Sequence, residues 1–432
     1  MLHTVNRFSI SPGVSLTCIV TDKFKTGCMS INLITALRRD TASLNALLPR
    51  VLRRGCAEHP DLLLIASALD ELYGARIIPI VRKKGEMHSI GLFVDFPDDR
   101  YIPDGGSVFE QTVNLAFGIL LAPLMPEGVF SSDYVESEKQ NLVDDIDASI
   151  NDKRSYSIDR LIKQMCADES YGINKLGGKA ETLDITPDSL TAHYHKLIAD
   201  SGIEILFCGS AQPRRVQDTL QAALASLPVR NAAPIPATEV IFSPAAESPR
   251  LFTEHMDVTQ GKLAVGFRLG RVMEKPDYPA LTVFNTVYGG DVTSKLFSVV
   301  REKLSLCYYV TSMIDKRKGL MVVASGIDFS NYEIVLSEIQ TQLDHVKRGA
   351  VSKREFLSAK RSVIAGIESS MDSLGGLEEL YFDSSVSEFP YDPAALRKKV
   401  QSVTLERIAE IASGIEIDSI YFLTSKTSGE KR

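Results

Sequence analysis

The sequence lacks the features that mark several classes of protein. Its net charge of −7 over 432 residues is mild and no basic cluster dominates, so nucleic acid is not expected as the main partner. The longest apolar run, LAFGILLAPLM at 115–125, is too short to span a bilayer and contains a proline. The first residues, MLHTVNRFSISPGVSL, lack the charged-then-apolar order of a signal peptide. We therefore predict a soluble protein that binds neither nucleic acid nor membrane.

Cysteine is sparse and scattered, and the Cys-x-x-Cys pair is missing. The six cysteines are Cys18, Cys28, Cys56, Cys166, Cys208 and Cys307. This spacing is not that of a disulfide framework or of a zinc-binding module. It predicts reduced, mostly buried thiols and a cytoplasmic protein.

What the sequence does contain is one order of elements that occurs twice. The elements are recognised by alternation of apolar residues in strands and by three-to-four spacing in helices. In the first half they are a strand at 29–33, helices at 44–52 and 60–72, and strands at 76–85 and 86–96. In the second half they are a strand at 263–269, helices at 281–289 and 296–304, and strands at 306–314 and 320–327.

The turns of the two halves also match, with VRKKGEM in one and DKRKGLM in the other. A strand–helix–helix–hairpin order found twice predicts an α+β fold with two homologous domains, each a mixed or antiparallel sheet flanked by helices. We place the N-terminal domain at 1–227 and the C-terminal domain at 251–432. The stretch 228–250 is rich in proline and alanine and is predicted to be the linker.

The most informative stretch is SKLFSVVREKLSLCY at 294–308. It places Arg301 late in an amphipathic helix and Tyr308 at the start of an apolar strand. With Gly289 and Gly290 upstream, it resembles the Gly-Gly…Ser-x-Leu-Phe…Arg-Glu-Lys…Tyr signature of the insulinase/pitrilysin-like zinc peptidase family. The resemblance implies that Arg301 and Tyr308 bind a peptide substrate, since both side chains donate hydrogen bonds to carbonyl or carboxylate groups.

Spacing alone also allows a structural role for this pair. Arg301 would then be a cation that stabilises the end of a helix, and Tyr308 would be a core aromatic. Tyr309 is expected to be a packing residue on the opposite face of the strand.

The family's zinc-binding motif, His-x-x-Glu-His, is missing. Aligning the first helix places the motif on residues 46–50, ALLPR, and places the distant glutamate ligand near Asp145. Ala46 has no donor atom, Pro49 cannot act as a base and is expected to kink the helix or delay its start, and Arg50 repels a cation. Because zinc catalysis needs three protein ligands and an open water position, we predict no metal, no cofactor and no catalytic residue.

Other polar residues do not supply a replacement site. His193 and His195 fall on a helix predicted to open at Thr186 and Pro187, and a spacing of two points them to nearly opposite faces. His88, in an alternating strand, is expected to face solvent. Scattered serine, histidine and aspartate residues form no recognisable nucleophile–base–acid group.

The resemblance therefore implies a non-catalytic subunit of a two-chain peptidase. Two such chains close around a chamber in which a zinc-bearing partner of the same family cuts the peptide. Among bacterial relatives, the sequence is similar to the zinc-lacking members that are encoded beside an intact zinc subunit. Two alternatives stay open: a homodimeric protein that binds peptide as a scaffold without cutting it, and an independent enzyme with an unrecognised site.

Overall fold

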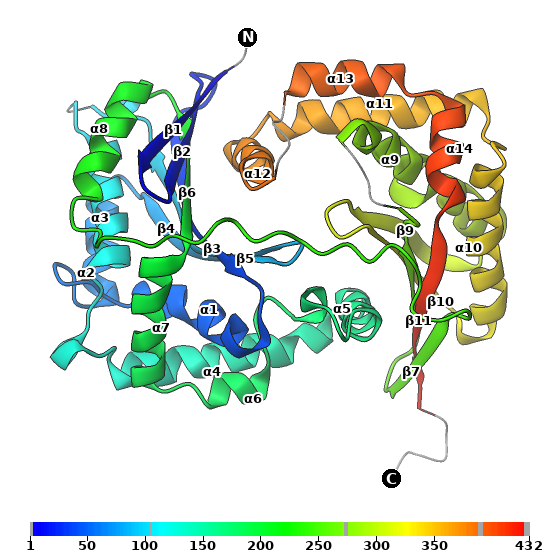
Figure 1. Ribbon diagram of the computed structural model, residues 1–432, viewed down its shortest axis with the longest axis horizontal. Helices are drawn as coiled ribbons and strands as arrows, with labels where there is room; N and C mark the ends of the chain where they lie inside the picture. The colour runs from blue at the N-terminus through cyan, green and yellow to red at the C-terminus, as the bar shows by residue number, and fades with distance from the viewer. Residues whose placement is uncertain (1–2, 104, 272–274, 388–391, 427–432) are drawn as a thin grey trace. The chain divides into compact units, whose positions relative to one another are not determined.

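The computed structural model describes residues 3–103, 105–271, 275–387 and 392–426. The chain forms two compact units (Figure 1). Unit 1 comprises residues 1–147, 173–237 and 370–391, and unit 2 comprises residues 148–172, 238–369 and 392–432. The predicted domains were contiguous, whereas each unit includes a segment from the other half of the sequence. Residues 228–249 contain neither helix nor strand.

Unit 1 is built on one six-stranded sheet with the order β1-β2-β6-β3-β5-β4. Its strands are β1 (Thr4–Ser11), β2 (Val14–Val20), β3 (Thr26–Ala36), β4 (Arg76–Lys84), β5 (Met87–Pro97) and β6 (Gly202–Gly209). The β2–β6 pair is parallel and the other pairs are antiparallel. Nearly every side chain of β3 is buried, because both faces of the sheet are covered by helices.

The two faces of this sheet are covered by different parts of the sequence. The helices of unit 1 are α1 (Arg39–Leu52), α2 (Leu62–Glu71), α3 (Val108–Leu121), α4 (Ser132–Ala148), α6 (Lys179–Leu183), α7 (Pro187–Asp200), α8 (Pro213–Ala223) and α12 (Leu374–Ser385). Helices α1, α3, α7 and α8 contact the sheet on one face, and α12 packs on β3 and β6 from the other (Figure 1). Glu378 of α12 is buried and accepts two hydrogen bonds from Arg82 at 2.8 and 3.0 Å.

Unit 2 repeats the strand order of unit 1. Its five-stranded sheet has the order β7-β11-β8-β10-β9, which corresponds to β2-β6-β3-β5-β4, and its one parallel pair, β7–β11, occupies the corresponding place. The strands are β7 (Arg250–Met256), β8 (Gly261–Arg268), β9 (Cys307–Asp315), β10 (Leu320–Ile327) and β11 (Glu416–Ser425). The predicted α+β fold with two homologous domains is thus confirmed.

The helices of unit 2 also cover both faces of their sheet. They are α5 (Lys153–Met165), α9 (Tyr278–Asn285), α10 (Tyr332–Lys347), α11 (Lys353–Ser370), α13 (Pro393–Ser402) and α14 (Leu405–Ser413). Helix α5, from the first half of the sequence, packs against β8, β10 and β11 through Leu161. It approaches so closely that a Cβ added to Gly266 would lie 2.5 Å from the sulfur of Met165.

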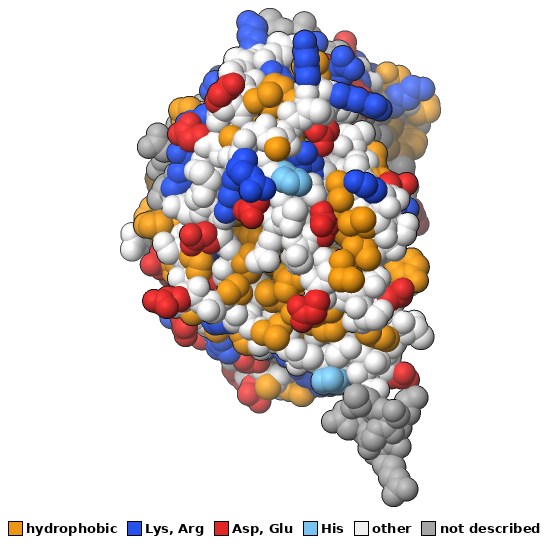
Figure 2. All heavy atoms as spheres, turned by 90° about the vertical axis from the view of Figure 1, so that its right-hand side faces the viewer, with side chains coloured by type: hydrophobic (Ala, Val, Ile, Leu, Met, Phe, Trp, Pro, Cys, Tyr) orange, Lys and Arg blue, Asp and Glu red, His pale blue; other side chains and the backbone are white. Residues whose placement is uncertain are grey.

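The surface of unit 2 is mixed in character. Figure 2, which views the chain from the side of α10 and α14, shows charged side chains of both signs interspersed with small hydrophobic groups. In the part of the chain that the structure describes, no helix combines the length and the apolar character needed to cross a bilayer.

Candidate functional site

Helix α1, which the alignment matches to the family's zinc-binding helix, is regular and packs with one face buried. Helix α1 begins at Arg39 and continues through Pro49, so the helix does not begin after the proline. Ala46 and Pro49 are both buried in its packed face. A buried alanine and a buried proline offer no ligand atom at these positions.

A salt bridge joins the remaining motif position to the predicted distant ligand. The Nη2 of Arg50 lies 2.7 Å from Oδ2 of Asp145, which belongs to α4. Just beyond the end of α1, Arg54 pairs with Glu138 of α4 at 3.3 Å. The two positions that the sequence alignment assigned to metal ligands are thus joined by an ion pair, and one of them is a permanently charged guanidinium, which cannot bind a metal ion. No group of three or more metal-binding side chains exists among the described residues.

Next to these salt bridges, Asn45 of α1 forms a polar cluster with His88 and His193. The prediction that His88 faces solvent is wrong. His88 is fully buried, not solvent-facing, because β5 lies inside the sheet and α1 covers this face. Asn45 bridges two histidines, with its Nδ2 3.0 Å from Nδ1 of His88 and its Oδ1 2.7 Å from Nε2 of His193. Burial lowers the pKa of both imidazoles to about 4. In the sequence, Asn45 is a polar residue within the apolar stripe of α1, and this pattern was the signal that could have revealed the buried polar cluster.

The two predicted substrate-binding residues both lie in unit 2. Arg301 belongs to a π-helical segment, Phe297–Lys303, and 43% of its side chain is exposed. Its guanidinium lies 4.6 Å from the ring centre of Phe297, and its Nε is 3.7 Å from Glu302. Its position in the last helical turn keeps the helix-end role open as well.

Tyr308 is not a core residue, since 62% of it is exposed. Its hydroxyl donates a long hydrogen bond of 3.3 Å to Asp328. The register between β9 and β10 shifts here, with Tyr309 opposite Gly326 and Cys307 opposite Ile327. Tyr308 is therefore the extra residue of a β-bulge, a feature that redirects a side chain away from the regular alternation of a strand.

The backbone around this pair is irregular over its whole length. Two π-helical segments, Thr286–Gly290 and Phe297–Lys303, replace regular α-helix, and Ser305 has a positive φ of 51°. A Cβ on Gly289 would lie 2.7 Å from Leu296, and one on Gly290 would lie 2.7 Å from Asn285. A side chain at either glycine would therefore force these neighbouring side chains to shift. Irregularities of this kind concentrate at functional sites.

Tyr309 has a different environment from its neighbour. It is half-buried, with Arg154 at 4.6 Å and Lys262 at 5.7 Å from its ring centre. Burial raises the pKa of Tyr309 to about 12. These contacts agree with the predicted packing role.

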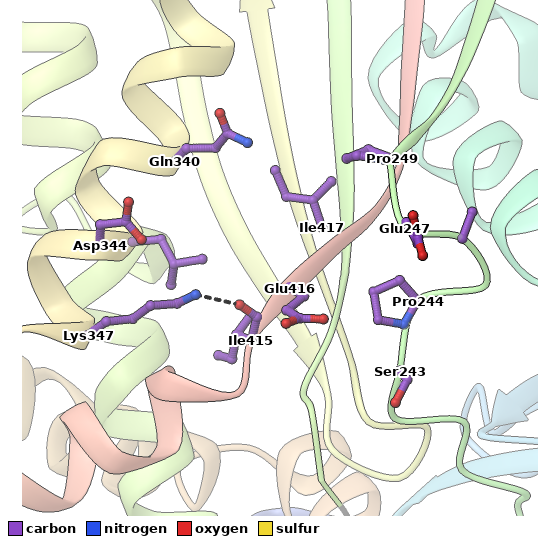
Figure 3. Close-up of a pocket in the computed structure, with 12 residues that line it drawn as sticks. Ser243, Pro244, Glu247, Pro249, Gln340, Asp344, Lys347, Ile415, Glu416 and Ile417 are labelled. Carbon is purple, nitrogen blue, oxygen red and sulfur yellow. Dashed lines mark hydrogen bonds between the residues drawn. The ribbon is translucent and has the colours of Figure 1, made fainter.

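A separate cleft of about 680 Å³ opens in unit 2 at the start of β11 (Figure 3). Glu247, Asp344 and Glu416 contribute carboxylates, and Lys347 donates a hydrogen bond of 2.8 Å to the carbonyl of Ile415. The cleft can hold a small polar or cationic group. Its lining contains no histidine, and neither Arg301 nor Tyr308 takes part in it.

The fold is thus duplicated, and α1 offers no metal ligand at positions 46, 49 and 50. Residues 184–363 match the Peptidase M16 inactive domain. Over 411 residues the chain is 31% identical to the probable inactive metalloprotease YmfF of Bacillus subtilis, covering 95% of this chain and 96% of that protein. The chain therefore belongs to the insulinase-like M16 peptidase family and is a homologue of its inactive members.

Other relatives extend this picture. The uncharacterized zinc protease YmxG of Bacillus subtilis is 22% identical over 284 residues, which cover 64% of this chain and 66% of that protein. A conserved protein from Enterococcus faecalis has a similar structure, with a TM-score of 0.88 at 27% identity over 98% of this chain and 99% of its own. A peptidase M16 inactive domain from Pseudomonas fluorescens shares the fold, with a TM-score of 0.80 at 17% identity over 98% and 99% of the two chains.

Proposed function

We propose that this chain is the non-catalytic subunit of a two-chain insulinase-like peptidase and that it binds peptide through Arg301 and Tyr308. The observation that carries the proposal is the irregular backbone from Thr286 to Tyr308, which presents both side chains at the surface. A helix end and a strand start without function would not need two π-helical segments and a bulge. The family resemblance of the motif supports the same pair.

The geometry around the pair suits the binding of a peptide backbone or a terminal carboxylate. Contact with the Phe297 ring limits the motion of the Arg301 guanidinium while leaving its paired N–H groups open. The long hydrogen bond from Tyr308 to Asp328 is weak, so a carbonyl of the substrate can replace it at little cost. A guanidinium and a phenol together offer donors to one acceptor group.

The chain needs a partner for chemistry. Ala46, Pro49 and Arg50 offer no zinc ligand and no general base, and Arg50 already neutralises Asp145. We infer that a zinc-bearing subunit of the same family supplies both, in the cytoplasm, where six buried thiols stay reduced. The rival functions are a homodimeric peptide-binding scaffold and an independent enzyme with another site.

One mixing experiment separates these three functions. The purified chain, a zinc-bearing family member from the same genome, and their mixture are assayed on a panel of unstructured peptides, with mass measured in solution. We expect activity only in the mixture, a complex containing one of each chain, and complete loss with a zinc chelator. A stable homodimer that ignores the zinc-bearing chain would favour the scaffold. Chelator-resistant hydrolysis by the chain alone would favour the independent enzyme.

A further inference from the structure

The sheet of unit 1 brings two cysteines together on neighbouring strands. Cys28 of β3 and Cys208 of β6 are directly opposite each other in antiparallel register. Residues so opposed have Cα atoms about 4.5 or 5.5 Å apart, and disulfides span Cα separations of about 4.4–6.8 Å. Both side chains pack in the same buried cluster on one face of the sheet. The backbone therefore already holds a separation that a disulfide can bridge.

A third cysteine nearby does not share this arrangement. Cys18 of β2 is in register with Phe207, the residue before Cys208, so its side chain points to the other face of the sheet. There Cys18 packs in the cluster of Met29 and Phe207, while Cys28 and Cys208 belong to the cluster under α12. Cys18 is as deeply buried as the pair and is a matched control.

Helix α12 separates the pair from solvent. Leu377, Tyr381 and Phe382 of α12 pack on the cluster that contains both cysteines, each of which is only 1% exposed. The hydrogen bond from Cys208, together with burial, raises the pKa of Cys28 well above its ordinary value. A protonated thiol is a poor nucleophile, so the pair is unreactive while α12 is in place.

We propose that Cys28 and Cys208 are a redox modification site that forms a reversible disulfide when α12 leaves the sheet. With hydrogen peroxide as oxidant, one thiolate attacks an oxygen, breaks the O–O bond and becomes a sulfenic acid, and the hydroxide released takes up a proton as water. The second thiol then attacks that sulfur, forms the S–S bond and releases a second water. Two thiols are oxidised, one peroxide is reduced, and a dithiol reverses the change.

The site of oxidation is tested on the full chain. The protein is treated with hydrogen peroxide, the remaining thiols are alkylated, and peptides are mapped without reduction. We expect a linked pair of peptides that contain Cys28 and Cys208, lost in Cys28→Ser and in Cys208→Ser and retained in Cys18→Ser. A link that includes Cys18, or oxidation of single cysteines without this link, would overturn the proposal. The wild-type map decides the matter even where a serine variant does not fold.

The dependence on α12 has its own test. Glu378→Gln weakens the buried pair with Arg82 that holds α12. Glu379→Gln changes a half-exposed neighbour that pairs with Lys84 and lies farther from Arg82, at 3.8 Å. A hydrogen bond to a charged group corresponds to roughly 10- to 150-fold in an opening equilibrium. We expect Glu378→Gln to form the disulfide faster by about that factor and Glu379→Gln to match the wild type. Equal rates in all three proteins would show that α12 does not control the site. If Glu378→Gln fails to fold, Arg82→Lys takes its place with the same expectation.

Discussion

The two units share a strand order, but the segment that follows β3 in unit 1 differs from the segment that follows the corresponding strand β8 in unit 2. After β3, unit 1 has the regular helix α1, whose motif positions are buried or joined in a salt bridge. After β8, unit 2 has α9 and then two π-helical segments with exposed Arg301. In unit 1 the motif positions are thus filled by ordinary packing and an ion pair. In unit 2 the corresponding segment has an irregular backbone, a feature that is frequent at functional sites.

The largest expected effect concerns residues 148–172, the segment of unit 2 that comes from the first half of the sequence. Glu169, just after α5, is paired with Arg268 at 2.6 Å and Lys318 at 2.6 Å, and both cations are almost completely buried. Glu169→Ala removes this carboxylate from both buried cations, although Arg268 keeps its ion pair with Asp418, and should cost about 3–5 kcal/mol of unfolding free energy. Urea unfolding measures it, with the exposed neighbour Asp168→Ala as the control. Equal stability of the two variants would mean that the buried group does not anchor the segment.

The second effect is a pH dependence that belongs to unit 1. Burial lowers the pKa of His88 and His193 to about 4, below the unfolded value of 6.5. The unfolded chain therefore binds more protons between these values, so stability is complete above pH 6.5 and falls as the pH drops toward 4. Each imidazole accounts for roughly 3 kcal/mol across the window.

Unfolding in urea at pH 7 and pH 5 measures this dependence. His88→Gln should be less sensitive to pH than the wild type, while His195→Gln, at an exposed position on the same helix as His193, should behave as the wild type does. An unchanged pH dependence in His88→Gln would assign it to other groups.

These particulars show what a sequence can predict. Alternation found the strands that became β3, β5, β8 and β10, and the repeated turns gave the duplication. The sheet on which a helix packs is set by contacts distant in sequence, so local patterns could not place α5 on unit 2 or α12 on unit 1.

The errors at single residues have physical causes as well. His88 was assigned to solvent because alternation assumes one wet face, whereas both faces of β5 are covered. For Tyr308 two roles were left open, and its exposure excludes the core role. That exposure depends on a bulge, and a register shift leaves no mark in the sequence of one strand. The motif itself could be found because its residue types and their spacing can be read directly from the sequence.

The third effect tests the exposed pair of unit 2, Arg301 and Tyr308, directly. In the complex with a zinc-bearing partner, Arg301→Ala should reduce kcat/KM by roughly 10- to 150-fold, because a charged hydrogen bond contributes about 1.5–3 kcal/mol. Tyr308→Phe should lose less, since a neutral hydroxyl contributes about 0.5–1.5 kcal/mol. Tyr309→Phe is the control and should be nearly silent, because its ring contacts remain. Unchanged kcat/KM in Arg301→Ala, with the complex intact, would assign the pair a structural role.

The smallest effect is expected at α1 of unit 1, where Arg50 pairs with Asp145. The salt bridge between Arg50 and Asp145 is partly exposed, at 23% and 55% of the two side chains, so Arg50→Gln should cost only about 0–1 kcal/mol. Arg50→His should restore a ligand type without restoring a site, because Ala46 and Pro49 supply none. Elemental analysis after dialysis against trace zinc should therefore find no stoichiometric metal in the wild type or in either variant. One zinc per chain in Arg50→His alone would show that unit 1 has metal ligands outside the motif. The contrast between a unit 1 without a metal site and a unit 2 with an exposed binding region would then be wrong.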